Sequence, residues 1–345
     1  MKKINYIIIF IIFLSYVTAQ QYRDIPDVVS KVGSSAANWL KIETGTRAIG
    51  MAGTQVAAGD DVSSIPYNPA SLAYIKRWQT FFSKSYYVAG ITHNTLAYGV
   101  QLGSTNYLGL HLFYLDSGDM TVTTFDNPDG YFDEGSNTLA TFAAEDYCFR
   151  LVYAKRLTDR LRIGGSLKYI REEIHTTYMH SWALDLGSNF KTGIYGMVLG
   201  MSVSNFGPDV MFQGDGLKIS GRSDDAQPYT MKTEQFGLPL SFRLGLKNDI
   251  IGQDDAIIKS KSSRLTFSLE GINHIDYTVF YSVGTEYSLL NEMVFLRAGT
   301  HIKHDSAGMS LGAGVNIKNI SVDYAYADYG LLLSTHQFGI GYRFK

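Results

Sequence analysis

The chain has 345 residues, a formal net charge of −2, one cysteine, and many glycine and aromatic residues, with 34 Gly, 24 Tyr and 19 Phe. The balanced charge offers no electrostatic attraction to nucleic acid, so we exclude nucleic acid as a partner. A single cysteine, Cys148, excludes an intramolecular disulfide. We interpret Cys148 as a small lumen-side or core residue without a redox role.

The N-terminal end has the pattern of a secretory signal peptide. Two lysines precede an apolar run from Tyr6 to Val17, and small residues up to Ala19 provide a cleavage site. The run is shorter than the roughly 20 residues of a spanning helix, so an uncleaved anchor is the weaker alternative. We predict a signal peptide over residues 1–19. No later apolar stretch is long enough for a spanning helix, so a membrane location requires a β-barrel.

Residues 20–77 do not alternate between polar and apolar positions, and we interpret them as a separate N-terminal element. The segment from Ser34 to Ile42 is a predicted short helix, with Trp39 and Leu40 as its anchoring side chains. A surface helix on a soluble domain is the alternative.

The second half of this element contains two local signals. Asp60 and Asp61 follow a stretch rich in Gly and Ala, and we interpret them as capping or hydrogen-bonding residues rather than a metal site. Asn68 is a good N-cap and Pro69 a good first helical residue, because proline loses nothing there by lacking an amide proton. A short helix up to Ile75 is therefore predicted.

From Gln79 onward the chain consists of short alternating runs separated by Gly, Asn, Asp and Ser, which is typical of barrel strands. We count about fourteen. They lie near residues 79–86, 95–102, 107–116, 146–155, 161–172, 181–189, 196–205, 238–248, 264–271, 278–289, 293–302, 309–317, 320–327 and 336–344. We predict an all-β transmembrane barrel over residues 78–345, with the aromatic faces toward lipid.

Connection lengths support this prediction, because bacterial barrels have short periplasmic turns and longer external loops. The two longest connections, 117–145 and 206–237, fall on the same side. The long segment 249–263 breaks the rule and could hide a miscounted strand. The external loops carry aromatic residues and Met that suit a protein interface, namely Tyr131, Phe132, Met211, Phe212 and Tyr229.

The final strand alternates strictly, with Phe338, Ile340, Tyr342 and Phe344 on one face. This pattern resembles the C-terminal signal that the bacterial barrel-assembly machinery recognises, with Gly339, Tyr342 and Phe344 as the matching residues. The resemblance implies the assembly machinery and outer-membrane lipid as partners. An ordinary strand of a soluble sandwich is the alternative.

The predicted inward faces carry mostly Gly, Ser and charged residues, which need partners inside the barrel. The charged positions are Arg150, Lys168, Asp185, Arg243, Glu270, Glu286 and Arg297. We therefore expect a polar, plugged lumen. No GxSxG, HExxH or phosphate-binding loop is present in the sequence, so we assign no catalytic residue, metal or cofactor.

The segment from Gly45 to Ala73 resembles the N-terminal signature of the PorV/PorQ family, within the FadL-like outer-membrane proteins. Ala52 and Ser71 stand where this signature has glycine. The matching residues are Arg47, Ala48, Gly50, Met51, Gly53, Val56, Ala57, Asp60, Asp61, Asn68, Pro69, Ala70, Leu72 and Ala73. The resemblance implies a fourteen-stranded barrel in the bacterial outer membrane, with residues 20–77 folded inside as a plug.

Three functions remain open. The PorV/PorQ resemblance implies binding or shuttling of secreted cargo proteins in type IX secretion or a related envelope process. A FadL-like channel for fatty acids or other hydrophobic compounds requires an apolar pocket against the plug, and a soluble exported β-protein requires a second sheet packed on the aromatic faces. Because the inward faces are mostly polar, we favour the protein-binding role.

Overall fold

The computed structural model describes residues 31–344, except 133–137, 220–228 and 254. The predicted signal peptide lies outside the described residues. Within the described part of the chain, no helix is long and apolar enough to cross a membrane.

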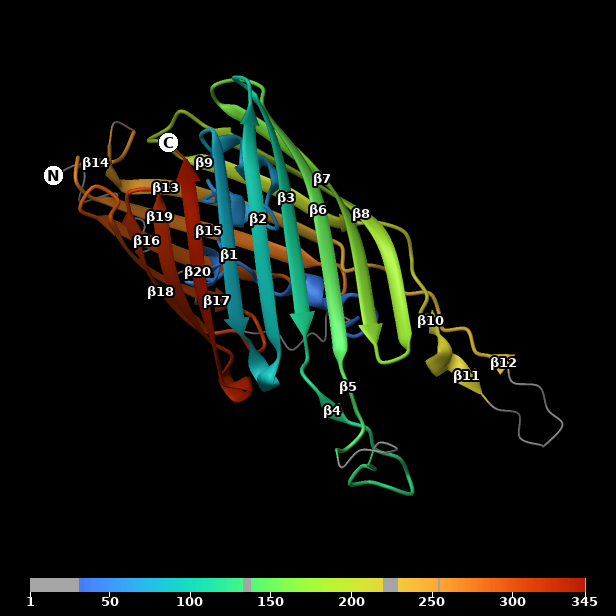
Figure 1. The fold of residues 1–345 in the computed structure, drawn as a ribbon. Helices are drawn as coiled ribbons and strands as arrows, with labels where there is room; N and C mark the ends of the chain where they lie inside the picture. The colour runs from blue at the N-terminus through green and yellow to red at the C-terminus, as the bar shows by residue number, and fades with distance from the viewer. Residues whose placement is uncertain (1–30, 133–137, 220–228, 254, 345) are drawn as a thin grey trace, which may run out of the picture. The chain divides into compact units, whose positions relative to one another are not determined.

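The wall is a closed antiparallel barrel (Figure 1). The main sheet has 16 strands, and without the two-residue strands β10 (Gln213–Gly214) and β14 (Ile258–Lys259) it leaves fourteen wall strands. These are β1 (Trp78–Tyr86), β2 (Thr92–Leu102), β3 (Asn106–Asp116), β6 (Ala144–Arg156), β7 (Leu161–Ile174), β8 (Thr177–Lys191), β9 (Val198–Phe206), β13 (Ser241–Gly252), β15 (Arg264–His274), β16 (Phe280–Leu289), β17 (Val294–Ile302), β18 (Met309–Ile317), β19 (Ile320–Asp328) and β20 (Ser334–Phe344). The last strand closes the wall on the first, with Phe344 opposite Trp78. The predicted fold and strand count are confirmed.

Along each wall strand, successive side chains point alternately to an apolar outer face and to an inner face, as expected for a strand between lipid and a lumen. In β6, Tyr147, Phe149 and Leu151 are exposed on the outside, whereas Cys148 and Arg150 are buried inside. In β20, Phe338 and Ile340 point outward while Gln337 and Gly339 point inward. The soluble-sandwich alternative is wrong, since no second sheet of the described chain covers these aromatic faces.

The two ends of the barrel differ in their connections. At one end, called the loop end, residues 117–143 carry the hairpin β4 (Met120–Thr121) and β5 (Thr141–Phe142), and residues 207–240 carry β10, β11 (Lys218–Ile219) and β12 (Tyr229–Thr230). Both hairpins extend beyond the wall strands (Figure 1). Short single-turn helices also lie at this end, namely η4 (Val88–Gly90), η5 (Asp215–Leu217) and η6 (Gly330–Leu332).

At the opposite end, called the turn end, most connections are tight, including residues 103–105 and 318–319. The long connection 253–263 lies here, as predicted. Its described residues contain no missed wall strand, because β14 only pairs in parallel with the last residues of β13.

The residues from Lys31 to Arg77, called the plug segment, contain η1 (Asn38–Lys41), α2 (Thr46–Ile49), η2 (Val62–Ser64) and η3 (Pro69–Tyr74). The two predicted helices are present as η1 and η3, but each is a shorter 3-10 turn. Isolated short helices gain little free energy from their own hydrogen bonds, so contacts with the wall decide their form. Figure 1 shows this segment in blue within the ring of strands.

Glycines on the inner wall let the plug segment lie directly against the strands. A Cβ atom at Gly187 of β8 would lie 2.0 Å from Asn68 Oδ1, and one at Gly299 of β17 would lie 2.4 Å from the backbone carbon of Met51. Any side chain at these positions would push the plug segment away. The abundance of glycine therefore reflects close approach of two backbones as well as turns.

Candidate functional site in the barrel lumen

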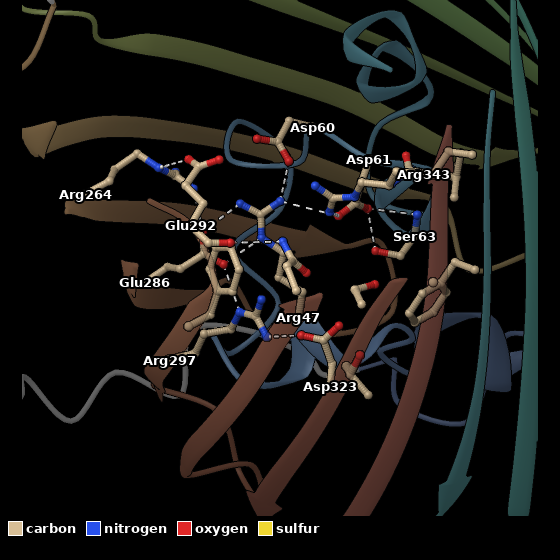
Figure 2. Close-up of a pocket in the computed structure, with 18 of the residues that line it drawn as sticks. Arg47, Asp60, Asp61, Ser63, Arg264, Glu286, Glu292, Arg297, Asp323 and Arg343 are labelled. Carbon is tan, nitrogen blue, oxygen red and sulfur yellow. Dashed lines mark hydrogen bonds and ion pairs between the residues drawn. The ribbon is translucent and has the colours of Figure 1, made fainter. Parts of the chain in front are cut away.

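The turn-end half of the lumen is built around Arg47, which the short helix α2 carries into the centre of the barrel. Its guanidinium donates to both carboxylate oxygens of Glu286 on β16, at 2.9 and 3.0 Å. It also donates to Asp60, and to Asp61 at 3.4 Å. Arg47 therefore joins two parts of the plug segment to the wall (Figure 2).

The network continues along the wall. Glu286 also accepts from Arg297 at 2.8 Å and from Arg264 at 3.2 Å, and Arg297 pairs with Asp323 at 2.6 Å. Arg343 lies 3.6 Å from Asp61. Figure 2 shows these side chains converging from β15, β16, β17, β19, β20 and the plug segment. The buried charges compensate one another, which is the condition for keeping them ionised.

The protonation of the plug carboxylates follows from these contacts. Burial would raise the pKa of Asp60, but the positive charges of Arg47, Lys247 and Arg264 hold it at about 2. Burial would lower the pKa of the Arg47 guanidinium, and the carboxylates of Asp60, Glu286 and Asp61 raise it well above its usual value. Both groups therefore stay charged across the physiological range.

A cavity of about 270 Å³ lies beside this cluster at the turn end. Its lining is mostly polar, with cations and carboxylates in similar number, including Lys247, Asp249, Arg264, Glu292, Asp323 and Arg343. An apolar solute would find little complementary surface here. This half of the lumen therefore serves to seat the plug segment.

The other residues of the resemblance motif also hold the plug segment in place. Gly50 packs on Gly312 of β18, the buried Met51 lies against Gly299, and Gly53 adopts a φ of +70° beside Glu43. The structure thus brings this part of the motif together against the inner face of the wall.

Two predicted caps are confirmed in the motif's second half. Asp61 caps η2 by accepting from Ser63 N at 2.9 Å. Asn68 caps η3 by accepting from Ala70 N at 3.0 Å, with Pro69 as the first residue. Asn68 also donates to Ser188 O at 3.1 Å, which ties the helix start to the wall.

The predicted inward charges find partners within the wall. Asp185 accepts from Lys168 at 2.6 Å and lies 3.7 Å from Arg150. Arg243 donates to Glu270 at 2.8 Å. The expectation that these charges pair inside the barrel is confirmed.

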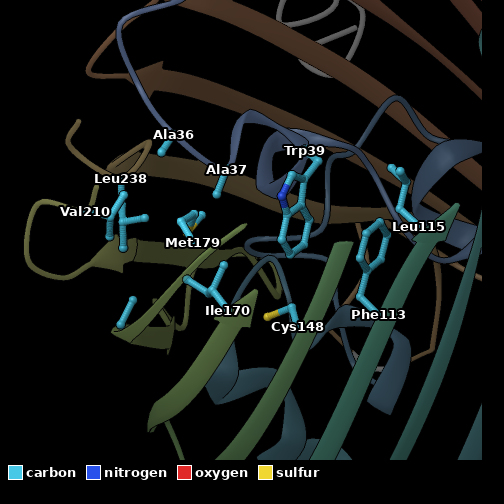
Figure 3. Packing of buried hydrophobic residues seen from close by; sticks show 11 residues of the cluster. Ala36, Ala37, Trp39, Phe113, Leu115, Cys148, Ile170, Met179, Val210 and Leu238 are labelled. Atoms are coloured by element: carbon cyan, nitrogen blue, oxygen red, sulfur yellow. The ribbon is translucent and has the colours of Figure 1, made fainter. Parts of the chain in front are cut away.

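The lumen also contains buried apolar clusters, and where they lie the prediction of a polar interior is wrong. One cluster, toward the turn end, packs Val62, Ile65 and Leu72 of the plug segment on the wall. A second lies in the loop-end half. Trp39 of the plug segment stacks on Phe113 of β3, with ring centroids 5.5 Å apart and planes 6° from parallel. Around this pair lie further buried apolar side chains (Figure 3), namely Leu115, Cys148, Ile170, Met179, Ala183, Val210 and Leu238. We call this set the Trp39 cluster. It was missed because these residues come from different strands and loops, and only the fold brings them together.

The predicted loop residues do not share one surface. Tyr131, Phe132 and Met211 are exposed, and Phe132 exposes 65% of its surface. Phe212 is only half-buried and packs on Phe236, against the Trp39 cluster, so it differs from the exposed position expected. Tyr229 lies in β12, and its side chain is outside the described part of the structure.

Of the assembly-signal residues, Tyr342 and Phe344 lie at the turn end of β20 and Gly339 lies in its middle. Trp78 stacks on Tyr342 and Phe344, with centroid distances of 5.1 and 5.7 Å. Gly339 faces inward, where a Cβ atom would lie 2.6 Å from Thr46 Oγ1. Tyr342 and Phe344 thus form part of an aromatic girdle, whereas Gly339 makes room for the plug segment.

The closed wall of fourteen strands, its apolar outer face and its plugged lumen define this chain as a bacterial outer-membrane β-barrel. Solved structures of FadL-like barrels share the fold. One is the Pseudomonas putida toluene transporter TodX, with 14% sequence identity, a TM-score of 0.51, and coverage of 86% of this chain and 96% of that chain. Another is a Pseudomonas aeruginosa FadL homologue, with 13% identity, a TM-score of 0.52, and coverage of 88% and 99%.

At these identities the likeness establishes the fold alone. No protein-family model matches the chain, and no curated protein matches it.

Proposed function

We propose that this protein is an outer-membrane channel that admits small hydrophobic compounds, held closed in this conformation by the plug segment. The observation that carries the proposal is the Trp39 cluster, a set of apolar and aromatic side chains in the loop-end half of the lumen. That the similar TodX structures carry the descriptions toluene transporter and monoaromatic hydrocarbon channel supports the same choice.

Uptake into cells that lack their own hydrophobic-compound channel tests this proposal. We expect expression of this protein to raise the initial rate of uptake of labelled toluene or oleate. Trp39→Ala should raise the uptake rate further, because it removes the side chain that occupies the centre of the Trp39 cluster. Trp182→Phe is the matched control, since Trp182 lies on the lipid side of β8. Uptake equal to that of cells with empty membranes would refute the proposal.

A second candidate is the PorV/PorQ-type role of binding or shuttling secreted cargo in type IX secretion. It is favoured by the two long loop-end connections, which expose Phe125, Tyr131, Phe132 and Met211 beyond the barrel wall. The motif from Gly45 to Ala73 adds to it by resemblance. Apolar side chains presented on extended loops suit a protein partner.

Crosslinking in the native envelope, followed by mass spectrometry, tests this second role. Cargo with a common C-terminal domain should be captured by the full-length protein. It should be lost when residues 119–142 are replaced by a short Gly-Ser linker, while the heat-modifiable barrel still forms. Capture that does not depend on this loop would contradict the role assigned to it.

A further inference from the structure

Next to the Trp39 cluster, three inward side chains form a row across neighbouring strands. Gln337 of β20 lies opposite Ser85 of β1, which lies opposite His93 of β2. All three are at most 1% exposed. Within the described residues, neither end of the Gln337 amide, neither nitrogen of His93, nor the Ser85 hydroxyl has a hydrogen-bond partner. We call this set the polar row.

The polar row is unusual because buried donors and acceptors in folded proteins are nearly always paired. One step deeper in the lumen, the hydroxyls of Ser83 and Thr95 are also buried without a partner in the described chain. The turn-end half shows the opposite arrangement, since Glu286 meets three arginines there. The polar row therefore offers hydrogen-bond donors and acceptors that the plug segment does not use, as a ligand-binding site would.

An aromatic surface adjoins the polar row directly. The His93 ring lies 5.2 Å from the Phe113 ring and 5.8 Å from the Tyr87 ring, measured between centroids. Phe113 also contacts Trp39, which stacks on it almost in parallel. Trp39 comes from a single turn of helix whose N-cap, Ala37, has a φ of 51°. The stacking position is thus filled by a side chain on a short, strained turn of the plug segment.

We propose that Phe113 and the polar row form a binding site for a flat, neutral aromatic molecule that carries a hydroxyl or similar hydrogen-bonding group, and that Trp39 occupies its ring position when no ligand is bound. This inference rests on the proposed channel function and names the substrate class. The ring would stack on Phe113, and the hydroxyl would both donate to and accept from His93 and Gln337.

The chemistry of the row excludes a charged ligand. Neither Gln337 nor Ser85 can supply a positive charge, and His93 is fully buried, where burial disfavours its charged form. A carboxylate buried without a cation would lose more hydration than the row returns. On the neighbouring wall, Arg150 is already engaged by His111 at 3.0 Å. A phenol fits the row, because one hydroxyl group serves as donor and acceptor at once.

The chain offers a direct probe of this site. It has 3 tryptophans, and Trp78 and Trp182 lie on the outer face of the wall, so the double substitution W78F/W182F leaves Trp39 as the only reporter. The purified barrel in detergent would be titrated with phenol, toluene and cyclohexanol, with free concentrations fixed by dialysis against protein-free micelles. Trp39 emission and calorimetric binding would be recorded together.

We expect phenol to shift Trp39 emission to longer wavelength and to bind about tenfold more tightly than toluene, as one net hydrogen bond allows. Cyclohexanol, which has the hydroxyl but no aromatic ring, should leave the emission unchanged. His93→Leu should remove the preference for phenol over toluene, and Gln337→Leu should do the same if H93L fails to assemble. Ser268→Ala is the control, because Ser268 is an equally buried hydroxyl on β15 without a partner in the described chain.

Equal affinities for phenol and toluene, or a preference that survives in both H93L and Q337L, would overturn the inference while leaving the channel function intact. Calorimetric phenol binding without any change at Trp39 would also overturn it, since the ligand would then lie elsewhere. Absence of binding by all three compounds, together with no uptake of toluene or oleate into cells, would remove the proposed function as well.

Discussion

Arg47 and Trp39 attach the plug segment to opposite ends of the lumen by contacts of different kinds. At the turn end, Arg47 meets Glu286, Asp60 and Asp61, and these charges compensate one another. At the loop end, Trp39 makes an apolar stacking contact next to polar side chains that have no partner in the described chain. The same turn is also held by Lys41, which pairs with Asp276 at 2.9 Å, and by Ala37 N, which donates to Glu172 at 2.7 Å. The Arg47 contacts therefore fit a permanent attachment, whereas the Trp39 stacking contact is one that a ligand can replace.

This difference matters because a buried ion-pair network is hard to open one contact at a time. Removing one partner leaves the others as uncompensated buried charges. An apolar contact has no such penalty when another apolar ring takes its place. The Trp39 side chain should consequently be displaced by a ligand while Arg47 remains seated.

The largest expected effect comes from breaking the turn-end network. Arg47→Met should weaken the attachment of the plug segment by about 3–5 kcal/mol, because Asp60, Asp61 and Glu286 lose a buried cation. Frequent opening events in planar-bilayer conductance would report the loss. Arg171→Met is the matched control, since Arg171 pairs with Glu173 on a partly exposed face and such pairs contribute about 0–1 kcal/mol. Conductance traces of R47M that resemble those of R171M would contradict the assigned role.

The second prediction concerns pH and Glu43, a carboxyl in the plug segment. Burial raises its pKa from 4.5 to about 7, against the opposing charge of Arg243. Glu43 holds its proton more tightly when the plug segment is attached inside the lumen than when it is released. The attachment is therefore strongest below pH 4.5 and weakens as the pH rises toward 7. Over this range the free energy that attaches the plug segment falls by an amount on the order of 3 kcal/mol. Open-channel frequency should therefore rise over this window, and Glu43→Gln should abolish the rise. An identical pH profile in E43Q would assign it to another group.

Asp60 should give the attachment of the plug segment the opposite pH dependence, in a separate pH range. Its pKa is lowered from 3.8 to about 2, so its contribution to seating is present above pH 4 and is lost only as pH falls toward 2. The two carboxyls can therefore be distinguished in one titration of open-channel frequency. Asp60→Asn should remove only the change at the acid end.

The smallest effect on stability is expected at the last strand. Phe344→Asp places a charge near the membrane interface, where such changes cost about 0–1 kcal/mol. If the C-terminal resemblance to an assembly signal is correct, the yield of heat-modifiable barrel in the outer membrane should nevertheless fall severalfold. Refolding into detergent in vitro should be nearly normal. Equal losses in both assays would mean that Phe344 acts through stability alone.

Much of the fold could be predicted from the sequence, because lipid outside and a lumen inside impose alternation on every wall strand. The alternation around Cys148 placed it correctly on the inner face, and the Asn68-Pro69 pair marked the start of a short helix. The motif also identified Arg47, Asp60 and Asp61. It could not identify Glu286 as their partner, since a residue 239 positions away from Arg47 is brought close only by the register of the closed barrel.

The loop-end site was beyond sequence reasoning for the same reason. Alternation indicates that Gln337, Ser85 and His93 face inward, but only the pairing of β20 with β1 and β2 puts them in one row. Similarly, Phe113 and Leu115 look like two apolar positions among many. Their place in one cluster with Trp39 follows from where the plug segment lies, so the polar lumen inferred from the inward faces was wrong for this part.

The most direct test of the central claim compares the reactivity of a thiol in each half. Cys148 lies within the Trp39 cluster, and in a C148S background Ser288→Cys places a thiol at an equally buried turn-end position. With both proteins in outer-membrane vesicles, we expect a maleimide to label Cys148 at least about tenfold faster, because local opening needs less free energy than release of the whole plug segment. Saturating phenol should accelerate the labelling of Cys148 only. Equal labelling rates at the two positions, with and without ligand, would contradict the account.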